Sequence, residues 1–123
     1  MLAAWNLGRI YRLRWKSNPD INWVINADTY LSEGLALQRP NRYTTEKMFL
    51  KYKYECAAMA QRNATAIAEY FGKKLKKAKS DHINFYTNAT LYINKRKEYE
   101  SIMLTIKNEM LTKYKTDVTK MDW

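Results

Sequence analysis

Apolar side chains recur at alternating intervals of three and four residues through two adjacent stretches, and this spacing constrains the fold more than any other feature. The first stretch begins near Thr44 or Thr45, and its repeating positions are Phe49, Tyr52, Cys56, Met59, Asn63, Ala66 and Tyr70. The second stretch begins at Ser80-Asp81, and its positions are Phe85, Ala89, Tyr92, Arg96, Tyr99, Met103, Ile106 and Met110. Such spacing follows one face of an α-helix, so we expect two long helices, ending near 79 and 116.

Only a short polar break separates the two stretches, and this predicts an antiparallel, coiled-coil-like hairpin. Its tip is marked by Gly72 and a dense group of lysines: Lys73, Lys74, Lys76, Lys77 and Lys79. Lysines are favoured at a helix C-terminus, but their mutual repulsion could also unwind the helix after Phe71. Either way, we expect a concentrated positive patch that contacts anions, lipid headgroups or RNA.

Two polar residues interrupt the repeating positions. Asn63 and Arg96 would lie on the helix–helix seam, where a buried polar group lowers stability but can fix the register. We hypothesise that Glu55 lies across the hairpin from Arg96 and pairs with it.

The first 43 residues form an N-terminal arm in this interpretation, and 44–123 form the hairpin as a single structural unit. Residues 2–16 are predicted as a basic amphipathic helix that stops before Pro19. Its apolar face is expected at Leu7, Ile10, Tyr11 and Trp15. A short helix should follow over 20–33, capped by Asp20 and ended by Gly34, with a linker over 35–43. The fold class is therefore all-α, a long hairpin with an arm of one or two shorter helices.

The composition removes several classes of protein. Three glycines and two prolines among 123 residues are too few for the turns of an all-β domain or for a phosphate-binding glycine loop. One cysteine and one histidine cannot form a disulfide framework or a Cys/His zinc site. The longest uncharged run, 82–94, is too short and too polar to span a bilayer.

No arrangement of residues predicts catalysis. Ser80, Asp81 and His82 are the residue types of a hydrolase triad, but neighbours at a helix start cannot adopt its geometry, and an N-cap accounts for the first two. Cys56 lies on the apolar seam and is predicted to be a small buried thiol. We therefore expect a non-enzyme with no catalytic residue, cofactor or metal.

The charge balance and the aromatic residues point to binding. Twenty-two Lys and Arg face 12 Asp and Glu, a formal net charge of +10, which attracts phosphate backbones and anionic lipids. Tryptophan, tyrosine and arginine dominate the energetics of protein interfaces. We expect partner contacts at Trp5, Arg9, Tyr11, Arg12, Trp15, Lys16 and Trp123.

The N-terminal segment is typical of a mitochondrial import sequence, because it is amphipathic, contains four basic residues and has no acid before Asp20. The alternative is a basic docking helix in any compartment. Within this segment, Ile10-Tyr11-Arg12 and the following Leu13, Arg14 and Trp15 resemble the Leu-Tyr-Arg signature of the LYR-motif proteins. The resemblance implies a small helical mitochondrial subunit or assembly factor. It covers six residues and departs at its first position, so we assign no family from it.

Together these features predict a non-catalytic accessory subunit of a large assembly. The expected setting is the matrix side of the mitochondrial inner membrane, in a respiratory-chain complex or ATP synthase. Its partners would be other protein subunits and anionic lipid headgroups, with no transmembrane span. The alternative is a mitochondrial ribosomal protein whose lysine-rich tip binds rRNA.

Overall fold

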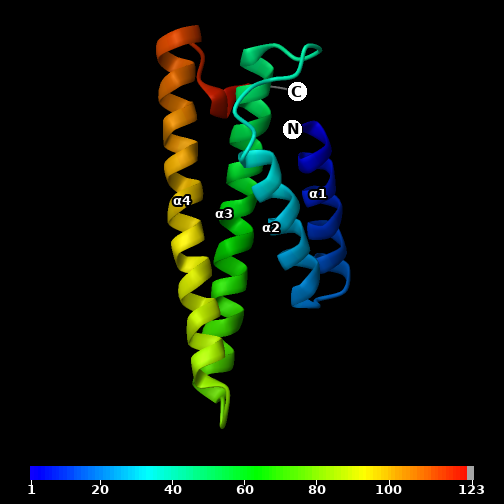
Figure 1. Cartoon of the computed structure of the whole chain (residues 1–123), viewed down its shortest axis with the longest axis vertical. Coiled ribbons are helices and arrows are strands. Elements are labelled where there is room, and N and C mark those ends of the chain that lie inside the picture. The colour runs from blue at the N-terminus through cyan, green and yellow to red at the C-terminus, as the bar shows by residue number, and fades with distance from the viewer. Residues whose placement is uncertain (122–123) are drawn as a thin grey trace.

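The structure is a computed structural model that describes residues 1–121, apart from the side chain of Leu2. Its elements are α1 (Leu2–Ser17), α2 (Ile21–Leu35), α3 (Glu46–Lys77), α4 (His82–Tyr114) and a 3-10 turn, η1 (Val118–Lys120). No strand occurs among the described residues. The predicted all-α fold, a long hairpin preceded by a two-helix arm, is confirmed (Figure 1).

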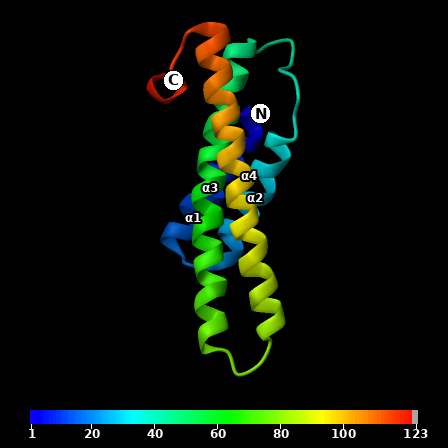
Figure 2. The ribbon, with the colours of Figure 1, turned by 90° about the vertical axis from the view of Figure 1, so that its left-hand side faces the viewer.

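The two long helices run antiparallel, and the shorter pair α1–α2 packs along one side of them (Figures 1 and 2). Two exposed contacts between α3 and α4 show the register of the hairpin. The Lys113 ammonium lies 2.6 Å from the Glu46 carboxylate, and the Gln61 amide donates to Glu100 at 3.3 Å. The tip of the hairpin extends beyond α1 and α2, at the opposite end from the C-terminal turn.

Two of the three predicted helix caps are confirmed. The Asp20 carboxylate accepts from the backbone N–H of Asn22 at 2.9 Å, and Thr45, rather than Thr44, accepts from Met48 at 3.2 Å. The predicted cap at Ser80-Asp81 is wrong. Asp81 has a left-handed backbone (φ 61°) in the tight turn after α3, and its side chain makes no capping hydrogen bond. The lysine stretch remains helical to Lys77, well past Phe71.

The core shows that α3 is buried on two faces. Besides the predicted Cys56 and Met59, it buries a second row of small and aliphatic side chains: Ala57, Ala60, Ala64 and Ile67. Three predicted seam residues, Tyr52, Ala66 and Tyr70, are only half-buried. A single seam was the wrong expectation for α3, because this helix contacts α1 and α2 as well as α4. The predicted seam of α4 faces inward: five of its eight side chains are buried, and Phe85, Arg96 and Met103 are half-buried.

The chain after α4 closes the open end of the hairpin. Lys115 adopts a left-handed conformation (φ 51°), and the backbone N–H of Thr116 donates to Met110 at 3.1 Å. The backbone N–H of Lys115 donates to the same carbonyl, and the left-handed conformation of this residue turns the chain back. Val118 then enters a cluster with Phe49 and Ile106 and is fully buried.

Cys56 is fully buried in the central cluster, and this carries a prediction. Burial raises the pKa of the thiol from 9.0 to about 12. The buried thiol is therefore held protonated well above neutral pH, where it forms very little of the reactive thiolate. We expect native protein to resist alkylation by iodoacetamide near neutral pH, whereas urea-unfolded protein is modified at once; equal rates would contradict the buried placement.

The raised pKa of Cys56 also makes the stability of the fold depend on pH. The folded state holds the thiol proton more tightly than the unfolded state does. The protonated thiol therefore contributes its full stabilisation below the pKa of the unfolded thiol, and this stabilisation is lost as the pH rises towards about 12.

Candidate functional site

The described residues contain no group of three or more His, Cys, Asp or Glu side chains placed to hold a metal ion. Their buried polar or charged residues are Asp28, Lys51 and Asn63. The question is therefore what each of these groups does inside a helical bundle, since an unpaired buried charge is strongly destabilising.

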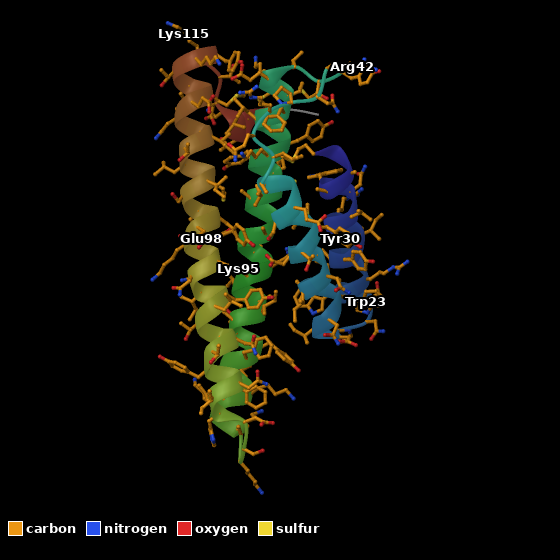
Figure 3. All side chains as sticks on the ribbon, viewed as in Figure 1. Trp23, Tyr30, Arg42, Lys95, Glu98 and Lys115 are labelled. Carbon is orange, nitrogen blue, oxygen red and sulfur yellow. The ribbon has the colours of Figure 1, made fainter. Side chains whose placement is uncertain are left out.

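Asp28 is the centre of a polar cluster that joins α2 to α4. Its side chain is 2% exposed; one carboxylate oxygen accepts from the Tyr99 hydroxyl at 2.6 Å, and the other from the Lys95 ammonium at 2.7 Å. Ser32, one helical turn after Asp28, lies 2.9 Å from the Tyr99 hydroxyl. We call these four residues the α2–α4 latch. Lys95, one of its members, lies on the middle of α4 in Figure 3.

The latch resembles a proton-transfer site in its residue types but not in its electrostatics. Burial and the hydrogen bond to Asp28 raise the pKa of Tyr99, so its hydroxyl is held protonated as a donor. A tyrosine that acts as a general base needs its pKa lowered towards neutrality. The ion pair and hydrogen bonds of the latch join α2 to α4 and so hold the arm on the hairpin. The sequence signal for it was Asp28 itself, an acid one turn from Val24 and three residues from Leu31 on the apolar face of α2.

Asn63, the polar residue predicted on the seam of α3, bonds to the arm. Arg12 donates to the Asn63 side-chain oxygen at 2.6 Å, so this arginine faces inward rather than outward. Burial and the nearby Arg62 lower the pKa of Arg12. The predicted pairing of Glu55 with Arg96 is wrong, because the register seen at Glu46–Lys113 and Gln61–Glu100 places them about two and a half turns apart. Glu55 pairs with Lys51 at 2.7 Å, and Arg96 lies 3.7 Å from Glu100.

The aromatic residues expected at a partner interface pack largely within the arm. Tyr11 stacks between Trp23 and Tyr30, with ring centroids 5.8 and 5.4 Å away, at the α1–α2 contact seen in Figure 3. Trp5 meets Tyr52 of α3 edge-on at 6.4 Å, and Trp15 packs half-buried against the central cluster.

The basic residues expected to contact partners mostly face outward. Arg9 and Lys16 are exposed on α1. The five lysines of the hairpin tip are exposed as well: Lys73, Lys74, Lys76, Lys77 and Lys79. None of these seven forms an ion pair within the described part of the chain. Trp123, also predicted as a contact, lies outside the described residues.

The apolar face of α1 differs from the predicted one. The helix turns Gly8 and Arg12 inward, whereas Leu7, Ile10 and Leu13 are 36%, 47% and 49% exposed. We call these three leucine and isoleucine residues the outer face of α1. The prediction was wrong because it did not place Gly8 and Arg12 on the inner face. In the structure Gly8 packs closely against Leu31, and Arg12 donates to Asn63.

A second exposed apolar row lies on α4, away from its buried seam. Tyr86, Ile93, Leu104 and Leu111 follow one another at intervals of 7, 11 and 7 residues, close to whole numbers of helical turns, so they share one side. Their exposed fractions are 63%, 38%, 60% and 45%. We call this row the outer stripe of α4.

Comparisons with models of protein families, with curated proteins and with solved structures find no match to this chain. The likeness to the LYR signature thus remains confined to its six residues. Among the described residues, no helix combines the length and the apolar character needed to cross a membrane.

Proposed function

We propose that this protein is a non-catalytic accessory subunit of a large multiprotein assembly, peripheral to the mitochondrial inner membrane, in a respiratory-chain complex or ATP synthase. Its long hairpin acts as a rigid strut, and its arm and outer surfaces contact neighbouring subunits.

The outer stripe of α4 is the observation that carries the proposal. A helix that already has a buried seam gains nothing from a second apolar row unless another surface covers it. The part of the stripe from Ile93 to Leu111 spans about 27 Å of helix, which is a suitable length for a partner helix and leaves Tyr86 outside that contact. The outer face of α1 adds a second exposed apolar surface.

The mitochondrial setting is supported by the N-terminal segment. Its basic side chains Arg9, Arg14 and Lys16 are exposed around an apolar outer face, the arrangement that import receptors and anionic surfaces recognise.

A mitochondrial ribosomal protein is the second candidate, and the lysines of the hairpin tip favour it. They are exposed beside Tyr70 and Phe85, whose rings could stack on unpaired bases while the ammonium groups contact phosphates. RNA contact of this kind weakens steeply with salt.

Charged substitutions in the outer stripe provide the test. We expect Ile93→Asp with Leu104→Asp to release the tagged protein from its large complex, because two buried carboxylates oppose docking, while the hairpin stays folded. The measurement is gradient sedimentation of gently solubilised mitochondria. The control, Asn94→Asp with Thr105→Asp, adds the same charge one residue further along α4, at exposed polar positions turned about 100° away from the stripe, and should sediment as wild type. Equal behaviour of the two variants would contradict docking through the stripe.

A further inference from the structure

The free end of the α3–α4 hairpin combines the densest positive charge of the molecule with exposed apolar side chains. Its five lysines lie within seven residues, and Ile83 and Tyr86 follow in the first turns of α4. We call these seven residues the hairpin tip. Figures 1 and 2 show that this end extends past the arm, so no other helix covers it.

Ile83 is the most exposed large apolar side chain in the described residues, at 84%, and Tyr86 is 63% exposed. Single apolar residues are ordinary on a protein surface. Here, however, both follow Lys79, the last of the five clustered lysines, by no more than seven residues, with only Glu69 and Asp81 as nearby acids in the sequence.

A shallow hollow of about 340 Å³ lies among the lysines, between the end of α3 and the start of α4. It is lined by Tyr70, Lys73, Lys74, Lys77, Ala78 and Phe85. The Lys74 ammonium lies 5.5 Å from the centre of the Tyr70 ring, so its aliphatic stem extends along an aromatic surface. An apolar floor with ammonium groups at the rim matches the boundary between acyl chains and phosphate headgroups.

We propose that the hairpin tip binds the surface of an anionic membrane, with its lysines on headgroup phosphates and with Ile83 and Tyr86 in the interfacial layer. This deepens the proposed function, since it assigns the membrane contact of a peripheral subunit to a specific end of the hairpin. Lysines near an anionic leaflet and apolar side chains in the interface both contribute to such binding.

The apolar residues favour a membrane over RNA. RNA would use the charge of the lysines and the faces of aromatic rings. An exposed isoleucine gains nothing from a phosphate backbone, but it is removed from water when it enters the interfacial layer. Ile83 therefore separates the two kinds of partner experimentally.

The test is co-sedimentation of the purified full-length chain with vesicles. We expect binding to phosphatidylcholine vesicles that contain a minority of phosphatidylglycerol, and little binding to pure phosphatidylcholine. Changing Lys73, Lys76 and Lys77 to Gln should weaken binding roughly 100-fold, since each lysine near the surface contributes about a factor of five. The matched control changes Lys97, Lys107 and Lys120 to Gln, which removes the same charge from exposed sites away from the tip.

Ile83→Ser should weaken vesicle binding roughly 10-fold, whereas Leu104→Ser on the outer stripe of α4 should leave it unchanged. Circular dichroism checks that each variant keeps its helices. Equal losses in the two triple-lysine variants, or wild-type binding by Ile83→Ser, would overturn the proposal. The proposal would also be overturned if the tip lysines were needed for binding single-stranded RNA but not for binding vesicles.

The vesicle assay is independent of any assembly. Vesicle binding by a protein that sediments alone in mitochondrial extracts would leave the membrane tip intact and remove the proposed function. If the protein enters a large complex but does not bind vesicles, the proposed function stands and the membrane-binding role of the tip is removed.

Discussion

Replacing Asp28 with alanine should lower the free energy of unfolding by about 3 kcal/mol, because the change removes the centre of the α2–α4 latch. The Tyr99 hydroxyl, on a side chain that is 4% exposed, loses its carboxylate acceptor, and the space left by the carboxylate stays empty. Lys95 is 29% exposed and can turn to water, which keeps the loss below that of a fully buried pair. Urea unfolding followed by circular dichroism measures the change.

The surface pair between Glu46 and Lys113 is the matched control for Asp28. Its 2.6 Å separation is as short as that of Asp28 and Lys95, but its side chains are 42% and 51% exposed. Solvent and salt screen such a pair, so Glu46→Ala should change stability little. Asp28→Asn should fall between the two, because it keeps an acceptor for Tyr99 and loses the charge. Similar effects from Asp28→Ala and Glu46→Ala would contradict the latch.

The second large effect concerns the glycines of the α1–α2 contact. A Cβ on Gly34 would lie 2.7 Å from the Cβ of Ala4, and one on Gly8 would lie 2.5 Å from Leu31, which is fully buried. The Ala4 Cβ is fixed to its backbone, so Gly34→Ala must push the helices apart. We expect a loss of about 2 kcal/mol for Gly34→Ala and a similar loss for Gly8→Ala, because the new Cβ would lie 2.6 Å from the Cγ of Leu31 inside the packed core.

Gly72→Ala is a control for which we expect the opposite change in stability. Gly72 lies inside α3, and a Cβ there would meet no atom within 4 Å. Gly72→Ala should therefore stabilise the protein by about 0.5–1 kcal/mol through helix propensity alone. Thermal unfolding of the three variants measures both signs. A stabilised Gly34→Ala variant would show that the two helices are not in close contact.

The helices themselves could be predicted closely from the sequence. Spacing of three and four along 49–110 and the turn signals near Pro19 and Lys79 place four helices within a few residues of their ends. Local capping was predictable where a polar side chain precedes an apolar periodic run, as at Asp20. It failed at Asp81, because the geometry of the turn after α3 overrides the preference of the side chain.

How the helices pack could not be read from one periodic row. A single row predicts a single neighbour, whereas α3 packs against three helices and buries Ala60 and Ile67 on a second face. The inward positions of Gly8 and Arg12 depend on Leu31 and Asn63, which are far away in the sequence. The Asp28–Lys95 pair spans 67 residues, so only the three-dimensional fold reveals it.

Of the candidate surfaces, too, some could be predicted from the sequence and one could not. The lysines of the hairpin tip and the charges of α1 were predictable, because dense like charges remain in solvent. The outer stripe of α4 was not, since Tyr86, Ile93, Leu104 and Leu111 are separated by polar residues and stand out only once their exposure is known.

Fractionation of gently solubilised mitochondria by native gel, with and without RNase, tests the central claim most directly. An accessory subunit of an inner-membrane complex should migrate in a very large, detergent-dependent complex that RNase leaves intact. Collapse of that complex on RNase treatment would contradict this account and favour the ribosomal alternative, and migration as a free 14.7 kDa protein would contradict both.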